Sequence, residues 1–376
     1  MRSIILIIGL LLPLAATQDR EVRVPLDGDF LLMDPHPRAL KVTPDGHMVV
    51  ADRHNHRFLV FSPAGKFLHA FGEQGEGPGQ FKRWFGEFTV GLGNRIYQVD
   101  FWGGNRGISV FSLQGKLERF IRIGLEENFG PQRIFVDRWG KIRLAVSRGM
   151  LRERKGGFQY AGAEVVFCAL DGEGRITQEY FRGREYFDFS DASGRGWPAI
   201  PHRVNLISAW CPRREIIAWQ KSDEDRVHLY SVPGGKTRSM PNGFTRRPLT
   251  AAHIRAWITE HLQLRHFQTF EPVYRKLARQ GASIETHLPV VDRLFFDAAG
   301  NLYAAARQEE EERWTVQCFR RDFALGRRLS VEHLPAWIGT QKVYFLIHDE
   351  DEDLYFLEIH PCDHTPWSFR KKEAQE

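Results

Sequence analysis

The stretch LKVTPDGHMVVADRHNHRFLVFSPAG, residues 40–65, decides the fold because it alternates short apolar runs with turn signals. One run begins at Leu40, the turn TPDG follows at 43–46, and a second run covers 47–51. The polar loop DRHNHR separates it from a third run at 58–61, which ends in the turn SPAG. Gly and Asp favour turns, whereas β-branched and aromatic residues favour strands. We therefore predict a four-stranded antiparallel meander.

This order of runs and turns recurs along the chain. The turn residue Gly46 is matched by Asn94, Gly140, Arg214, Gly300 and Glu352, at steps of 48, 46, 74, 86 and 52 residues. One unit cannot bury both faces of its small sheet, whereas six units packed radially around an axis can. We predict an all-β fold, a single six-bladed β-propeller over residues 20–370 that is followed by a charged tail at 371–376.

The two ends of the chain are predicted to close the ring together. The last unit shows strand-like runs at 343–347, 354–359 and 367–370, and it lacks a fourth run. The sequence EVRVPL, residues 21–26, is a spare strand near the beginning of the chain. If it pairs with the last unit, only short and protected strand edges remain.

Residues 49–81 carry a more specific pattern, VVADRHNHRFLVFSPAGKFLHAFGEQGEGPGQF. An Ala-Asp pair precedes Asn55, His56 and Arg57, and a Gly-rich segment that ends in GQF closes the stretch. This pattern resembles the NHL repeat. The second unit keeps part of it, at Asp100, Asn105, Arg106, Phe111 and Gly115. The resemblance implies an exported six-bladed propeller of the NHL-like kind, a group that includes binding scaffolds.

Residues 1–17, MRSIILIIGLLLPLAAT, have the parts of a secretory signal peptide. Arg2 precedes an apolar run at 4–14, and small residues follow at 15–17. A run of about 11 residues is too short to span ~30 Å of hydrocarbon. We expect a cleaved leader and a mature protein that is secreted or periplasmic and has no membrane span. An uncleaved anchor helix is the alternative.

The composition is typical of an ordered globular protein. Hydrophobic residues make up 42% and charged residues 26%, which excludes disordered and fibrous classes. The net charge of +5 is modest, and together with export it argues against a nucleic-acid partner. We expect a monomer. The sequence allows two interpretations of the four widely spaced cysteines: they form disulfides, or they are buried thiols. These residues are Cys168, Cys211, Cys318 and Cys362.

Residues 236–289, within the 86-residue step, are predicted to form a basic helical insertion between blades 4 and 5. Thr250 can cap a first helix, and a second helix runs from Pro272 to Gly281. The buried stripe of the first helix is Ile254, Trp257, Ile258 and Leu262. Between 236 and 279, nine Lys or Arg and two acids give +7, so the rest of the chain sums to −2.

The insertion is expected on the ring face that carries the blade connections and the loops between second and third strands. Predicted loops at 148–162 and 184–202 belong to the same face. Insertions on one face of a repeat array often mark its working surface. We predict that a protein or a glycan-like, anionic ligand binds there, although loops without a partner are the alternative. The predicted partner-binding residues are Arg246, Arg247, Arg275 and Lys276.

Basic residues also recur just before the predicted inner strands. If they point at the central channel, they form a cationic mouth for a carboxylate or phosphate, because guanidinium groups donate paired hydrogen bonds to such groups. The alternative is that they bond neighbouring carbonyl groups or cap the rim. These residues are Arg38, Arg133, Arg203, Arg293 and Lys342.

A metal site is a further possibility at the same mouth. His36, His202 and His287 lie in blade connections and could together hold Zn²⁺ with an open position. Acidic runs at 309–312 and 349–353 lack the turn-forming Gly of a calcium loop. The sequence favours a non-catalytic exported binding scaffold without a cofactor. The alternative is a metal-dependent lyase or hydrolase with Zn²⁺ or Ca²⁺ at the channel mouth.

Overall fold

The computed structural model describes most of the chain. It covers residues 22–26, 39–75, 77, 79–81, 87–100, 107–124, 129–191, 198–281, 283–308, 313–349 and 354–361. Within these residues the strands form six four-stranded antiparallel sheets, which are the six blades predicted from the sequence.

In five blades the four strands follow one another along the chain, and the first strand is the inner one. Blade 1 consists of β2 (Leu40–Val42), β3 (Met48–Asp52), β4 (Arg57–Phe61) and β5 (Phe67–Phe71). Blade 2 consists of β6 (Phe88–Val90), β7 (Ile96–Asp100), β8 (Gly107–Phe111) and β9 (Leu117–Arg122). Blade 4 consists of β14 (Leu206–Cys211), β15 (Ile216–Lys221), β16 (Arg226–Ser231) and β17 (Lys236–Pro241). Blade 5 consists of β18 (Arg293–Phe296), β19 (Leu302–Gln308), β20 (Arg313–Phe319) and β21 (Leu325–Val331).

Blade 3 is much longer than the others. It consists of β10 (Phe129–Val136), β11 (Ile142–Lys155), β12 (Phe158–Leu170) and β13 (Ile176–Asp191). The prediction of loops at 148–162 and 184–202 is therefore wrong in large part, because β11 and β12 stay paired up to Lys155 and Phe158. The C-terminal half of β11 is exposed and rich in charged residues, so the apolar alternation that marks a strand is missing there.

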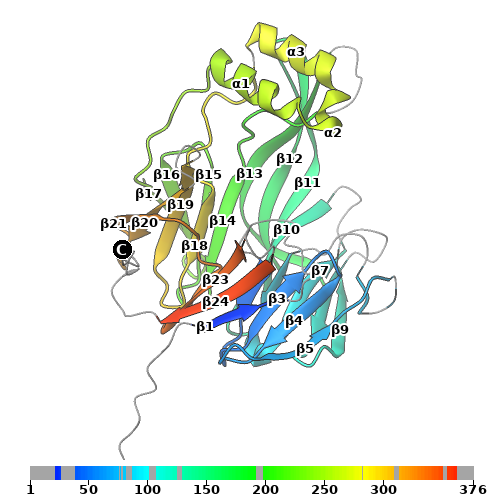
Figure 1. The fold of residues 1–376 in the computed structure, drawn as a ribbon, viewed down its shortest axis with the longest axis vertical. Helices are drawn as coiled ribbons and strands as arrows, with labels where there is room; N and C mark the ends of the chain where they lie inside the picture. The colour runs from blue at the N-terminus through cyan, green and yellow to red at the C-terminus, as the bar shows by residue number, and fades with distance from the viewer. Residues whose placement is uncertain are drawn as a thin grey trace, which may run out of the picture.

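Blade 6 joins the two ends of the chain, as predicted. Its strands are β22 (Trp337–Ile338), β23 (Lys342–Asp349), β24 (Leu354–Pro361) and β1 (Val22–Pro25), in that order from the inside. Figure 1 shows β1, at the blue end of the colour scale, beside the orange-red β24. The predicted runs at 343–347 and 354–359 are strands, but they are the second and third strands of the blade and not the first and second. The sequence did not indicate the inner strand, because it has only two residues and gives little apolar signal. The predicted run at 367–370 lies outside the described residues.

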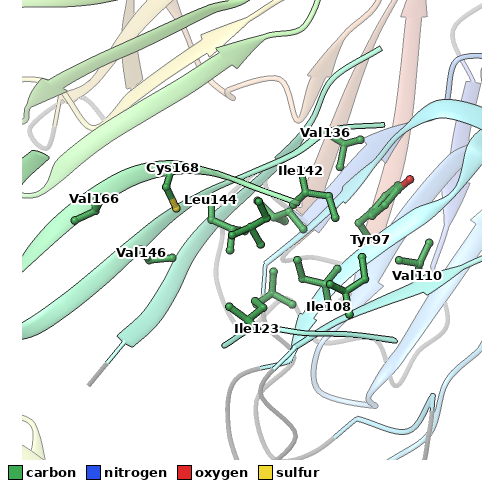
Figure 2. Packing of buried hydrophobic residues seen from close by; sticks show 14 residues of the cluster. Tyr97, Ile108, Val110, Ile123, Val136, Ile142, Leu144, Val146, Val166 and Cys168 are labelled. Carbon is green, nitrogen blue, oxygen red and sulfur yellow. The ribbon is translucent and has the colours of Figure 1, made fainter. Parts of the chain in front are cut away.

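Apolar residues fill the interface between each blade and the next. Six clusters of buried side chains lie between blades 1 and 2, 2 and 3, 3 and 4, 4 and 5, 5 and 6, and 6 and 1. Figure 2 shows the cluster between blades 2 and 3, where Ile108 and Val110 meet Ile142 and Leu144. Since all six interfaces exist, the blades close into a ring.

The Asp-Asn-Arg pattern of blade 1 stabilises the turn between β3 and β4. Asp52 is fully buried, and its Oδ2 atom accepts hydrogen bonds from Asn55 Nδ2 at 3.0 Å and from Arg57 Nε at 2.7 Å. These residues therefore satisfy a buried carboxylate, which is a structural role. The equivalent Asn105 and Arg106 of blade 2 lie outside the described residues.

The cysteines that the structure describes are free thiols inside the protein. Cys168, Cys211 and Cys318 are all buried. Burial raises the pKa of Cys168 to about 12 and that of Cys318 to about 11, so both stay protonated at neutral pH. Cys362 and the predicted leader at 1–17 lie outside the described residues. Among the helices described, none is both long and apolar enough for a membrane span.

Candidate binding surface

Two insertions meet at one end of the molecule and form a projection that we call the tower, residues 149–162, 184–191 and 242–289. Figure 1 shows α1 (Ala251–His261), α2 (Arg265–Gln268) and α3 (Glu271–Gln280) together beside the far ends of β11, β12 and β13. Blade 3 contributes the sheet of the tower, and the connection between blades 4 and 5 contributes its helices. The predicted position of the helical insertion between blades 4 and 5 is confirmed, but its predicted start at residue 236 is too early, because Lys236–Pro241 is the outer strand of blade 4.

The two longer helices begin and end as the sequence predicts. The Thr250 side chain accepts a hydrogen bond from the His253 backbone N–H, and the His253 ring bonds the Thr250 backbone in return. The helix α3 has Pro272 in its first turn and ends at Gly281, whose φ of 58° favours glycine. An added Cβ at Gly281 would lie 2.6 Å from Cβ of Ala251, so the end of α3 touches the start of α1.

The tower has an apolar core of its own, which binds the helices to the long strands. Trp257 lies between the two helices, with ring-centroid distances of 5.7 Å to Phe267 and 5.8 Å to Tyr274. Trp257 and Leu262 pack against the core, as their predicted place on the buried stripe requires. The buried members of the core are Phe158, Tyr160, Phe189, Ile200, Ile254, Ile258, Val273, Tyr274 and Leu277.

A narrow neck connects the helices to blade 4. The chain leaves through 246–249 and returns through 284–288, and backbone hydrogen bonds join these segments, from Leu249 N–H to Thr286 O at 3.0 Å and from Leu288 N–H to Arg247 O at 2.9 Å. The returning chain then attaches to the loop between β15 and β16, because the N–H groups of Val290 and Val291 both donate to Ser222 O, at 2.7 and 3.0 Å. The neck therefore fixes the tower to the ring.

Two carboxyl groups with raised pKa values lie where the neck meets blade 4. Burial raises the pKa of Glu285 to about 7; Lys221 opposes this shift, and the negative charge of Asp223 adds to it. The Val204 backbone N–H and Lys155 also lower the Glu285 value. Burial raises the pKa of Asp223 as well, against the charges of Lys221 and Arg246. Within the described residues, Asp223 Oδ1 is buried without a hydrogen-bond partner. This junction therefore contains one carboxyl group, Glu285, whose charge changes near neutral pH, beside a second one with a raised pKa.

We predict that Glu285→Gln stabilises the protein at pH 8. The ordinary pKa of a glutamate side chain is 4.5. Well below this pH, Glu285 is protonated in both the folded and the unfolded chain. As the pH rises towards 7, the unfolded chain loses this proton first, so the folded state loses stability. At pH 8 the variant should gain about 1 to 3 kcal/mol in free energy of unfolding, since one pKa unit corresponds to about 1.4 kcal/mol. Denaturant unfolding at several pH values measures the difference.

The control for this prediction is Glu271→Gln on α3, where the carboxylate is exposed and pairs with Arg275. If the Glu285→Gln variant gains the same free energy of unfolding from pH 4 to pH 8, the raised pKa of Glu285 is contradicted. A comparable pH dependence in the control would contradict it as well.

The predicted cationic channel mouth is largely neutralised by neighbouring acids. Arg133 Nη1 lies 3.1 Å from Glu87 Oε1, and both side chains are mostly buried. Arg203 Nη2 lies 3.5 Å from Glu185 Oε2, whose other oxygen accepts the Leu206 backbone N–H at 2.5 Å. Carboxylates of the protein thus pair with both arginines.

The other three predicted mouth residues do not complete a ring of charges in the described part of the chain. Arg293 begins β18 and is only 9% exposed. The placement of Lys342 is wrong, because it begins the second strand of blade 6, and its Nζ donates to Pro63 O, at the turn between β4 and β5, at 3.2 Å. That turn lies on the ring face opposite the tower. Arg38 lies outside the described residues.

The two described histidines of the predicted metal set bond to the helical insertion. His202 has a φ of 51°, and its Nε2 lies 3.2 Å from His253 O. His287 Nδ1 lies 2.9 Å from Arg246 Nη2, which donates to it. In the described ranges, no three His, Cys, Asp or Glu side chains gather closely enough to hold a metal ion. His36 lies outside those ranges.

The predicted partner-binding residues have different surroundings. Arg246 is part of the neck, since its Nε donates to Asp223 O at 3.1 Å and its Nη2 lies 3.8 Å from Asp223 Oδ2. Arg247 and Arg275 are exposed, and Arg275 pairs with Glu271 at 2.5 Å. Lys276 Nζ lies 5.6 Å from the ring centre of Phe158. Reversing the charge of Arg246 would therefore disturb the neck, contrary to the expectation from the sequence.

Sequence reasoning did not single out three further exposed arginines on the helices, Arg255, Arg265 and Arg279. They occupy polar positions of the helical pattern, so the apolar stripe itself indicated that they face outward.

One family model matches the first two blades of the chain. The family model DUF5128, described as a 6-bladed beta-propeller, matches residues 31–129. This stretch contains blades 1 and 2, where the repeat is most clearly recognisable in the sequence, and it ends at the first residue of β10. The chain is a six-bladed β-propeller. No curated protein matches the sequence.

Several solved structures resemble this propeller at low identity. A member of the DUF4221 family from Bacteroides vulgatus is 7% identical with a TM-score of 0.48, covering 91% of this chain and 96% of that one. Virginiamycin B lyase from Staphylococcus aureus is 8% identical with a TM-score of 0.43, covering 91% and 99%. Regucalcin from Agrobacterium tumefaciens, a calcium-binding protein, is 11% identical with a TM-score of 0.40, covering 87% and 92%. The resemblance to the NHL repeat stays a prediction.

Proposed function

We propose that this propeller is a non-catalytic, exported binding protein that engages an anionic partner on the tower. The observation that carries the proposal is the common core of the tower, in which Phe158, Tyr160 and Phe189 from blade 3 pack against α1 and α3 from a separate insertion. Two insertions at distant points of the chain thus build one body on one ring face. Such additions to a repeat scaffold often form its binding surface.

The charge of the insertion supports an anionic partner. Residues 242–289, which follow β17, contain seven Lys or Arg and three acids and sum to +4, whereas the rest of the chain sums to +1. A field with this direction raises the rate of encounter with acidic partners and is screened beyond about 8 Å at physiological salt. Export rests on the leader predicted at residues 1–17.

The test compares two variants with the same change in net charge. The tower variant is R255E/R265E/R279E, and the lower-face variant is R138E/R213E/R321E, which changes exposed turn residues at the opposite end of the ring. Labelled protein is incubated with the cell-envelope fraction of the producing cells at low salt, and the retained label is measured. We expect the tower variant to lose capture and the lower-face variant to keep it. Equal capture of both variants would refute the proposal.

A further inference from the structure

The outer surface of the helical layer carries arginines that the fold does not use. We call the exposed Arg255, Arg265, Arg275 and Arg279 the basic face. Among the described residues, the guanidinium groups of Arg255, Arg265 and Arg279 have no hydrogen-bond or ion-pair partner. Arg275 is the exception, because it pairs with Glu271.

Two arginines of the basic face, Arg255 on α1 and Arg279 on α3, lie near the point where these two helices touch, whereas Arg265 belongs to α2. Gly281 touches Ala251, which brings the last turn of α3 to the first turn of α1. Arg279 is two residues before Gly281, and Arg255 is about one helical turn after Ala251. Lys155, at the end of β11, lies at the neck, where its Nζ donates to Ile284 O at 3.1 Å and its charge lowers the pKa of Glu285.

The large apolar side chains of the layer point the other way. Trp257, Phe267 and Phe270 pack against the tower core. Among the described residues of the layer, the exposed large apolar side chain is that of Leu264, which is 49% exposed. Its other exposed residues are Ala252, Ala256, Thr259, Glu260, Gln263, Gln268, Thr269, Pro272 and Gln280.

This composition favours a hydrated polymer over a folded protein as the partner. Stable protein interfaces depend on a few aromatic or arginine anchors that are buried in desolvated pockets. The basic face offers arginines on a polar surface whose aromatic residues are turned inward. Guanidinium groups bind carboxylate and sulfate groups through paired hydrogen bonds, and these contacts tolerate water around them.

We propose that the basic face binds an acidic polysaccharide, a chain of sugars that carry carboxylate or sulfate groups. This inference rests on the proposed function and names the class of its partner. Successive anionic groups along the polymer contact arginines of α1, α2 and α3, and the binding weakens with salt because the charges are exposed.

The first experiment uses defined polymers as probes. Polygalacturonate, heparin and neutral dextran are immobilised, and binding of the intact protein and both variants is measured by surface plasmon resonance at about 0.01 M and about 0.15 M salt, where the Debye length is about 30 Å and about 8 Å. We expect binding to the two acidic polymers only, with at least about tenfold weaker binding by the tower variant. The lower-face variant should bind within about twofold of the intact protein.

Equal weakening in both variants would overturn the proposal, because the protein would then respond only to net charge. Binding to dextran that resists salt would overturn it as well. Circular dichroism and thermal unfolding of both variants show whether the helices and the ring are intact, so a folding defect is distinguished from a binding defect.

The second experiment separates this proposal from the proposed function. Envelope fractions are treated either with periodate, which oxidises sugar diols, or with protease, before capture of the intact protein is measured. Loss of capture after periodate supports the polysaccharide. Loss after protease alone, with the tower variant still defective, refutes the polysaccharide but leaves the tower as a binding surface for a protein. Capture that does not depend on the tower refutes both.

Discussion

Deletion of residues 22–26 is expected to open the ring and to leave a protein that unfolds easily or aggregates. The strand β1 pairs with β24 from Val22↔Ile359 to Pro25↔Phe356, and Leu26 N–H donates to Tyr355 O at 2.9 Å. Leu26 is 4% exposed in the core between blades 6 and 1. Loss of this side chain alone should cost about 2 to 5 kcal/mol. The newly exposed edge of β24 adds a site for association with other chains.

Denaturant unfolding and size-exclusion chromatography of the mature protein measure this effect. The control is deletion of the predicted tail, 371–376, which should leave the free energy of unfolding unchanged. A milder variant, Leu26→Ala, should lose part of the stability while remaining monomeric. If the deletion of 22–26 unfolds at the same denaturant concentration as the intact protein, ring closure by β1 contributes nothing and the prediction is wrong.

The second large effect is expected at the buried ion pair of blade 3. Arg143 Nη1 lies 2.7 Å from Asp137 Oδ2, and the two side chains are 5% and 1% exposed. Asp137 Oδ1 also accepts the backbone N–H groups of Trp139 and Lys141, at 2.9 and 2.8 Å. Arg143→Met should cost about 3 to 5 kcal/mol, because it leaves a buried carboxylate without its cation.

A double variant separates the charge from the packing. Asp137→Asn combined with Arg143→Met removes both charges, so it should recover part of the lost stability, whereas Asp137→Asn alone leaves the arginine unpaired. Arg95→Met serves as the control, since Arg95 and Glu118 form a pair at 2.5 Å with partly exposed side chains, and the change should hardly affect unfolding. The same loss in the single and the double variant would show that packing, not charge, explains the effect.

The ring could be predicted from the sequence because its turns depend on local chemistry. Gly46 has a φ of 92°, which favours glycine, and its N–H donates to Thr43 O at 2.9 Å. The matching turns of blades 2, 3 and 5 also have a residue with positive φ, at Asn94, Gly140 and Gly300. The inner strand of blade 6 could not be predicted, because Trp337–Ile338 is too short to show an apolar pattern. Its outer strand was nevertheless recognised, since EVRVPL had no partner nearby.

The tower could be predicted only in part. The caps at Thr250 and Gly281 and the apolar stripe depend on neighbours in sequence, and the helices followed them. The packing of α1 and α3 on β12 and β13 depends on residues about a hundred positions away, which no local pattern reveals. The same holds for Arg246, whose contact with Asp223 arises only when the neck reaches the loop after β15.

The origin of blade 6 has a consequence for the order of events during synthesis. Its outer strand is made before blades 1 to 5 and its other three strands after them. The ring therefore cannot close while the ribosome is still adding blades, because β1 has no partner until β24 has been made. Contacts between such distant residues form late, since a long loop must first be ordered. An incomplete chain thus keeps an open ring, and the ring closes only after β24 has been made.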